Sequence, residues 1–146
     1  MHAGLACSLS SEMIISIILR YSKNSKTITM VIIYHYTSAS NAIKIENSGV
    51  IYQSTSPAAY GKGVYLTSLS PSNKTDTIAF NNHTRSQLGE QQREKYAKKA
   101  EVAFEFDSDE IGATQIRSTR GRDIWVVHDK DIILGNCAWR KVYTRM

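Results

Sequence analysis

Tyr34-His35-Tyr36-Thr37-Ser38 and Tyr60-Gly61-Lys62-Gly63-Val64-Tyr65-Leu66-Thr67 are the most informative segments of this chain. The first ends an apolar, β-branched run that begins at Val31, and such a run is typical of a buried strand. The second leads through two glycines into an aromatic strand, which we expect to cover 63–67. A histidine and several hydroxyl groups thus stand at one strand end, and a tyrosine lies on the strand that follows. This combination favours the binding of an extended dinucleotide.

Short helices are expected after both strands. Ser38 or Ser40 can cap a helix that passes through Ala42 and Ile43 and ends at Gly49. Extended structure resumes at 50–52, and a small-residue loop follows at 54–59. Ser70-Pro71 predicts the start of a second helix that runs to about residue 82 and buries Ile78 and Ala79. The polar segment 84–99 is interpreted as a solvated helix, with a mobile loop as the alternative.

The last third of the chain has the pattern of β structure. In the segment 101–107, Val102, Phe104 and Phe106 are expected to point one way and both glutamates the other, which is typical of a half-buried strand. The segments 124–127, 132–134 and 139–143 predict further strands, and Gly135-Asn136 predicts a turn between the last two. Few and short helices among many strands indicate an α+β domain with a mostly antiparallel sheet.

Length and composition limit the number of domains and the kinds of partner that the chain can have. The chain has 146 residues, 42% of them hydrophobic, and a net charge of +5, which indicate one globular domain with a preference for anionic partners. Nucleic acids, acidic proteins and a pyrophosphate all fit that charge. Cys7 and Cys137 lie far apart, and the four histidines have no metal-ligand spacing. We therefore expect free thiols in a reducing, cytoplasmic environment and no metal site.

Residues 1–29 differ from the rest and are interpreted as an N-terminal extension before a domain at 30–146. Its apolar run, 13–19, is too short to span a bilayer, and no positive charge precedes it as in a signal peptide. A flanking helix that begins at Ser10 or Ser11, followed by a polar linker, is the preferred interpretation. No membrane contact is expected.

The glycines around Lys62 are weak evidence when taken alone, because a tight turn into a strand also explains them. Their pairing with Val64-Tyr65-Leu66 and with His35 upstream is more specific. The run from Tyr34 to Pro71 resembles the HYD-signature group of ADP-ribosyltransferase-like domains, and it is also similar to the NAD site of poly(ADP-ribose) polymerases. The C-terminal strands share this resemblance loosely. It implies a split, mostly antiparallel sheet and NAD as a co-substrate.

The resemblance also implies roles for individual residues. His35 would bond the 2′-hydroxyl of the adenine-side ribose, and the main chain of Tyr36 would bond the nicotinamide carboxamide. Tyr65 would stack on the nicotinamide ring. Further contacts with NAD are expected from a loop, a helix and the flanks of both stretches, namely Thr37, Ser38, Ser54, Tyr60, Gly61, Gly63 and Phe80, with Ser56 as a lesser candidate.

The third catalytic position is an acid near the start of a late strand. Asp123 stands in the matching place, immediately before Ile124. Many relatives carry glutamate there, although some members of the HYD group use aspartate. Aspartate is shorter by about 1.5 Å, so the strand must lie closer or the acid is misplaced. The alternative acids are Glu90, Glu94 and Glu101, and each is also explained as a solvated charge.

The resemblance implies transfer of one ADP-ribose unit from NAD to an acceptor, most readily a protein, by a monomeric enzyme. An inactive NAD-binding or protein-docking module of the same fold is the alternative. Removal of an RNA 2′-phosphate with NAD is a third hypothesis, which ranks lower. The basic residues Arg117, Arg120 and Arg122 upstream of Asp123 either steer an anionic substrate or keep the surface soluble. A host-directed toxin and an endogenous enzyme fit equally well.

Overall fold

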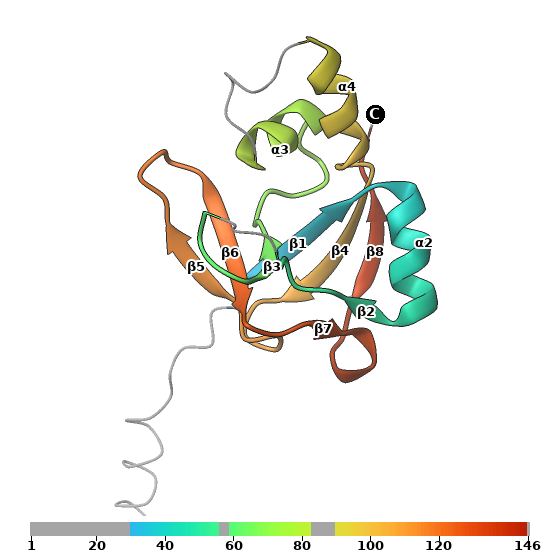
Figure 1. Cartoon of the computed structure of the whole chain (residues 1–146), viewed down its shortest axis with the longest axis vertical. Coiled ribbons are helices and arrows are strands. Elements are labelled where there is room, and N and C mark those ends of the chain that lie inside the picture. The colour runs from blue at the N-terminus through green and yellow to red at the C-terminus, as the bar shows by residue number, and fades with distance from the viewer. Residues whose placement is uncertain (1–29, 56–58, 83–89, 146) are drawn as a thin grey trace, which may run out of the picture.

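The structure is a computed structural model, and it describes residues 30–55, 59–82 and 90–145 (Figure 1). Within these residues the fold is α+β, as predicted. The predicted N-terminal helix, the linker and Ser56 lie outside the described residues. The elements follow in the order β1 (Ile32–Thr37), α2 (Ala39–Ser48), β2 (Val50–Ile51), β3 (Gly63–Leu66), α3 (Thr75–Asn82), α4 (Glu90–Lys98), β4 (Val102–Asp107), β5 (Thr114–Arg117), β6 (Asp123–His128), β7 (Ile132–Ile133), η2 (Leu134–Asn136) and β8 (Arg140–Tyr143).

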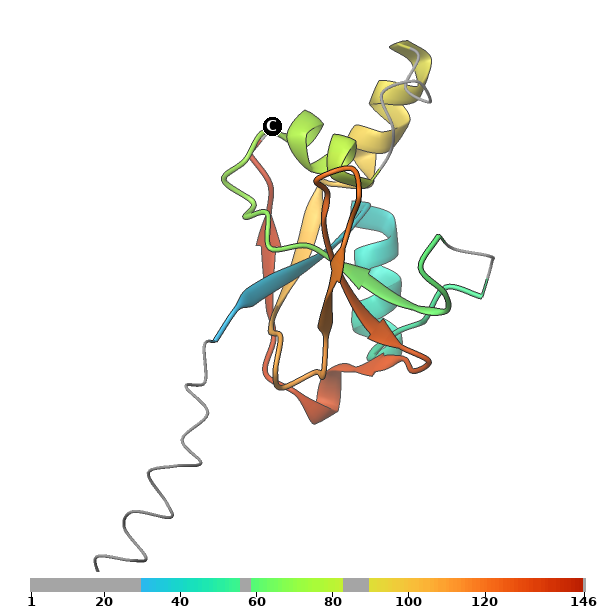
Figure 2. The ribbon, with the colours of Figure 1, turned by 90° about the vertical axis from the view of Figure 1, so that its left-hand side faces the viewer.

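The strands form a split antiparallel sheet. One sheet has the order β1-β4-β8, a second has the order β3-β6-β5, and β2 pairs with β7. The two larger sheets meet where Tyr34 of β1 bridges Thr67, just after β3, through main-chain hydrogen bonds of 2.8 and 3.0 Å. Figures 1 and 2 show α3 and α4 together at one end of the molecule and α2 beside the β1-β4-β8 sheet. The split sheet expected from the resemblance is confirmed.

The core lies where apolar residues of several strands meet. On β4, Phe104 and Phe106 are buried, whereas Glu105 faces the other way and pairs with Arg140 at 2.7 Å. The predicted alternation holds for these residues, whereas Ala103, on the same face as Glu105, is also buried, so β4 is covered on both faces there. Burying each phenylalanine removes a large apolar area from water, which stabilises the fold by roughly 1.5–3 kcal/mol per side chain. The packed cluster also includes Ile33, Val64, Leu66, Val127, Ile132 and Leu134.

Helix α2 begins and ends at the predicted residues. The Ser38 hydroxyl accepts a hydrogen bond of 3.3 Å from the Asn41 amide at the first turn. Gly49 ends the helix with a φ of 69°, in the left-handed region that glycine adopts without a steric penalty. The carbonyl of Gly49 then accepts from the Leu134 amide at 2.8 Å, which ties the helix end to the strand pair β2–β7.

The predicted start of the second helix was wrong. The second helix begins at Thr75 rather than at Ser70-Pro71, because the Ser70 oxygens are used in a local turn with Ser72 and Asn73. The turn predicted at Gly135-Asn136 is present as the 3₁₀ helix at 134–136, and the strands on either side of it pair with other strands, β7 with β2 and β8 with β4. Strand β5, which is mostly exposed, was not predicted at all. Among the described residues, no helix is both long and apolar enough to cross a membrane.

Candidate functional site

The predicted residues His35 and Tyr65 meet where β1 passes β3. Nδ1 of His35 lies 3.0 Å from the main-chain carbonyl oxygen of Tyr65. A carbonyl can only accept, so Nδ1 carries the proton in this hydrogen bond. Although the ring keeps some exposed surface, burial lowers the pKa of His35, against the opposing effect of the bond to Tyr65. The ring is therefore neutral at pH 7, and its Nε2 presents a lone pair as a hydrogen-bond acceptor.

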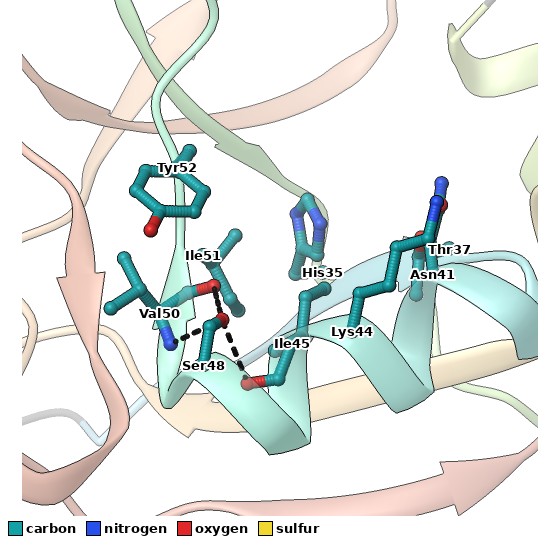
Figure 3. Close-up of a pocket in the computed structure, with 9 residues that line it drawn as sticks. All are labelled: His35, Thr37, Asn41, Lys44, Ile45, Ser48, Val50, Ile51 and Tyr52. Carbon is teal, nitrogen blue, oxygen red and sulfur yellow. Dashed lines mark hydrogen bonds between the residues drawn. The ribbon is translucent and has the colours of Figure 1, made fainter.

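A cavity of about 370 Å³ opens beside His35, between α2 and β2 (Figure 3). Polar side chains from β1 and α2 line one part of it, and apolar side chains line the rest. Sequence reasoning missed most of these residues. Helical spacing could have found Asn41 and Lys44, because they lie one turn apart on the helix that follows His35. The lining consists of His35, Thr37, Asn41, Lys44, Ile45, Ser48, Val50, Ile51 and Tyr52.

The backbone requires glycine at both Gly61 and Gly63, before Tyr65. Gly61 has a φ of 89°, which other residues rarely adopt. A Cβ on Gly63 would lie 2.6 Å from the Val127 carbonyl oxygen, so β3 can approach β6 this closely only without a side chain there. The phenol of Tyr65 donates to the Gly61 carbonyl oxygen at 2.6 Å, and burial raises its pKa, which keeps it a donor.

The loop before β3 is hydrogen bonded to the start of that strand. The main-chain amide of Ser54 donates to the carbonyl oxygen of Gly63 at 2.9 Å. Tyr60 is half-buried and lies in the turn that leads to Gly61. The predicted residues Ser54, Tyr60, Gly61 and Gly63 are thus neighbours of Tyr65, and the main-chain contacts give Gly61 and Gly63 a structural role.

Asp123 stands at the first residue of β6, and the protein surrounds its carboxylate with donors. Oδ2 accepts from the Thr67 hydroxyl at 2.7 Å and from both the hydroxyl and the main-chain amide of Ser68. Oδ1 accepts from Gln115 at 3.3 Å and from the Trp125 indole at 3.2 Å. Partial burial opposes ionisation, but the hydrogen bonds from Thr67, Ser68 and Gln115 outweigh it and hold the pKa of Asp123 below its usual value.

These contacts link the three predicted positions. His35 bonds the carbonyl of Tyr65, and Thr67, two residues farther along, bonds the carboxylate of Asp123. The short aspartate side chain reaches this far because the end of β3 lies directly beside the start of β6.

Phe80 joins this region through its neighbour in the chain. It is half-buried on α3, and the next residue, Asn81, hydrogen bonds both main-chain groups of Asp123, at 2.7 and 2.9 Å. Sequence reasoning did not single out Asn81. No local signal marks it, because its partners lie 42 residues away.

Tyr36 and Thr37 of β1, and Ser38 directly after it, have separate roles. Tyr36 donates its phenol proton to the Leu69 carbonyl oxygen at 2.7 Å, and burial raises its pKa. Thr37 is buried and lines the cavity beside His35. Ser38 caps α2, so its hydroxyl already has a structural partner.

The alternative acids have other partners. Glu101 accepts from the Ala39 amide at 2.9 Å, and Glu94 pairs with Lys98 on the surface of α4. The side chain of Glu90 lies outside the described part of the chain. Arg117 and Arg120 are exposed on and after β5, and Arg117 stands opposite Asp123 in the β5–β6 pairing. Cys137 is a free, half-buried thiol.

Comparison with known proteins identifies the family. Residues 33–134 match a family model described as an HYD1 signature containing ADP-ribosyltransferase. Neither the curated proteins nor the solved structures gave a match. The matched range runs from β1 to the start of η2, and it includes His35, Tyr65 and Asp123. The chain therefore belongs to the family of HYD1-signature ADP-ribosyltransferases.

Proposed function

We propose that this protein transfers one ADP-ribose unit from NAD to a nucleophile on an acceptor protein and releases nicotinamide. The observation that carries the proposal is the hydrogen-bonded connection from His35 through β3 to Asp123. It gathers a neutral imidazole, an aromatic ring and an ionised carboxylate along the line where the sheet splits.

The adenosine half of NAD fits the cavity beside His35. Nε2 of the neutral imidazole accepts a hydrogen bond from the 2′-hydroxyl of the adenine-side ribose. Thr37 and Asn41 offer further polar contacts in the cavity, and Lys44 adds a positive charge for the pyrophosphate. A cavity of about 370 Å³ falls within the usual size of a ligand site.

The main chain of Tyr36 is oriented toward the nicotinamide carboxamide. In an antiparallel pair, the main-chain groups of alternate residues point toward and away from the partner strand. Those of Tyr34 point away from β4, since they bond Thr67. The N–H and C=O of Tyr36, two residues on, face the same side of β1. They can bond the carboxamide as a pair, which holds the nicotinamide ring at the split.

Tyr65, Phe80 and Asp123 form the part of the site where the bond to nicotinamide breaks. Stacking of the Tyr65 ring on the cationic pyridinium is favourable by roughly 0.5–2 kcal/mol, and Phe80 supplies a second aromatic wall. When the bond between ribose C1′ and the nicotinamide nitrogen breaks, its electron pair neutralises the ring. The ionised Asp123 stabilises the positive charge that develops on the ribose. The acceptor then bonds C1′ and loses its proton.

A second candidate is a module that binds NAD without turnover. It is favoured by the number of donors around Asp123, because five hydrogen bonds from the protein occupy much of its carboxylate. A carboxylate so well satisfied is also what a purely structural residue would have. Its remaining capacity to accept from the ribose decides between the two candidates.

The test is nicotinamide release by the purified full chain incubated with NAD, beside Asp123→Ala and the exposed Asp109→Ala as a matched control. The proposal expects release by the wild type and by the control and none by Asp123→Ala. Wild-type release that Asp123→Ala retains would remove Asp123 from the mechanism. NAD binding without any release would establish the binding module instead.

A further inference from the structure

The side-chain amide of Asn81 forms a double hydrogen bond with the main chain of Asp123. Its Oδ1 accepts from the Asp123 amide at 2.9 Å, and its Nδ2 donates to the Asp123 carbonyl oxygen at 2.7 Å. Only this orientation of the amide group satisfies both main-chain partners, because the main-chain N–H must donate and the C=O must accept.

Asn81 thereby takes the place of a strand partner. The regular pairing of β3 with β6 ends at Leu66 opposite Trp125, which follows Asp123 by two residues in the chain. The main-chain groups of Asp123 that face this side would have no ladder partner from β3. The amide of Asn81, on helix α3, supplies both hydrogen bonds that such a partner would make.

The same amide also orients the Thr67 hydroxyl. Nδ2 of Asn81 lies 3.3 Å from Oγ1 of Thr67, and the Leu69 amide donates to the same oxygen at 3.2 Å. With its oxygen accepting from these two donors, the hydroxyl directs its own proton to Oδ2 of Asp123, at 2.7 Å. Asn81 thus acts on Asp123 at the main chain and, through Thr67, at the carboxylate.

We propose that Asn81 is a positioning residue, which fixes the carboxylate of Asp123 and couples its place to helix α3 without contacting NAD. The inference rests on the proposed function. Because Phe80 precedes Asn81 on α3, this one side chain sets the position of the acid relative to the aromatic wall. Catalysis is sensitive to such alignment, since a misplacement of about 1 Å can reduce the rate roughly a hundredfold.

The rest of α3 keeps the variants folded. Ile78 is fully buried and Ala79 nearly so, which holds the helix on the domain without Asn81. Asn81→Ala removes all three hydrogen bonds of the amide. Asn81→Asp keeps the acceptor for the Asp123 amide but loses both donors. Asn73→Ala is the matched control, because the amide of Asn73 donates to the Ser70 carbonyl in the same connection and does not contact Asp123.

The first experiment measures nicotinamide release by the full chain against NAD concentration and pH. For Asn81→Ala we expect kcat to fall about tenfold to a hundredfold while KM for NAD changes less than about threefold. The acid limb of the kcat profile should move to higher pH, because loosening Thr67 weakens a bond that lowers the pKa of Asp123. Asn73→Ala should match the wild type. An unchanged kcat and acid limb, or a change confined to KM, would overturn the inference.

A second measurement separates this inference from the proposed function. The carboxyl pKa of Asp123 can be followed by NMR titration in the wild type and in Asn81→Ala, whether or not the protein turns NAD over. A higher pKa in the variant supports the positioning role even if no nicotinamide is released. An unchanged pKa overturns that role even in an active enzyme.

Discussion

His35 and Tyr65 are joined by a hydrogen bond of 3.0 Å across the split between the two larger sheets. The bond runs from a ring nitrogen to a main-chain oxygen, so a change of the Tyr65 side chain leaves it in place. It also fixes which nitrogen of His35 carries the proton and which one is left for a ligand. The ligand-facing properties of the two residues can therefore be altered separately.

Stability should depend on pH through His35. Burial lowers its pKa below the ordinary 6.5, so the unfolded chain binds a proton at a higher pH than the folded chain. The stabilising contribution of the neutral ring is complete above pH 6.5 and decreases as the pH falls below that value. The free energy of unfolding can be measured with denaturant at several pH values from about 7.5 to about 5. As the pH decreases over this range, it should fall more steeply in the wild type than in His35→Ala.

The control for this prediction is His128→Ala, since His128 is exposed at the far end of β6. Its pH dependence should follow that of the wild type. Parallel curves for His35→Ala and the wild type would mean that His35 does not titrate differently in the folded state.

The role of Tyr65 is expected to lie in its ring. Tyr65→Phe removes the hydroxyl that donates to Gly61 but keeps the aromatic face. It should retain most of the nicotinamide release, with a loss of about threefold or less. Tyr65→Ala also loses the stacking interaction, so its kcat/KM should fall about tenfold or more, given roughly 0.5–2 kcal/mol for the stack and the lost ring contacts.

Tyr143→Ala serves as the control for lost aromatic surface, because Tyr143 is 67% exposed and lies on β8. Equal losses in Tyr65→Phe and Tyr65→Ala would assign the effect to the hydroxyl and its bond to Gly61, and the stacking role would be dropped.

Much of this fold could be predicted because its signals are local. Alternation marks β4, Ser38 and Gly49 delimit α2, and the two glycines before Tyr65 reflect the backbone that leads into β3. The position of Asp123 followed from its place before an apolar strand. These features depend on a few neighbouring residues, so the sequence alone displays them.

The features that were missed depend on contacts made far along the chain. Strand β5 is mostly exposed and has no apolar face, and its extended form follows from pairing with β6. Asn81 gains its role only when α3 meets Asp123. Ser70-Pro71 has the pattern of a helix start, but the Ser70 hydroxyl bonds within its own turn, which competes with capping.

Asp123 should tolerate neither loss of charge nor added length. Asp123→Asn removes the negative charge and places an amide where Thr67 and Ser68 both donate, so kcat for nicotinamide release should fall about a hundredfold or more. Asp123→Glu keeps the negative charge, but its carboxylate stands about 1.5 Å farther out. Since the aspartate already contacts the end of β3, the longer glutamate must push the end of β3 away.

We therefore expect the kcat of Asp123→Glu for nicotinamide release to remain below that of the wild type. The affinity of both variants for NAD should change only a few-fold. Full activity of Asp123→Glu would show that the site has room for the longer acid. Release by Asp123→Asn at the wild-type rate would contradict the proposed stabilisation of charge.

Gly63 should be required for the approach of β3 to β6. A methyl group there would meet the Val127 carbonyl oxygen at 2.6 Å and a Val126 methyl at 2.7 Å, and the carbonyl belongs to the backbone of a buried strand. Gly63→Ala should lower the free energy of unfolding by about 1–3 kcal/mol, as overpacking usually does. Gly135→Ala is the matched control, because nothing lies within 4 Å of its added methyl. Thermal unfolding of both variants should show a lower Tm for Gly63→Ala alone. If the two variants unfold at the same temperature, β3 can shift away from β6 at little cost, and the close contact does not fix the position of Tyr65.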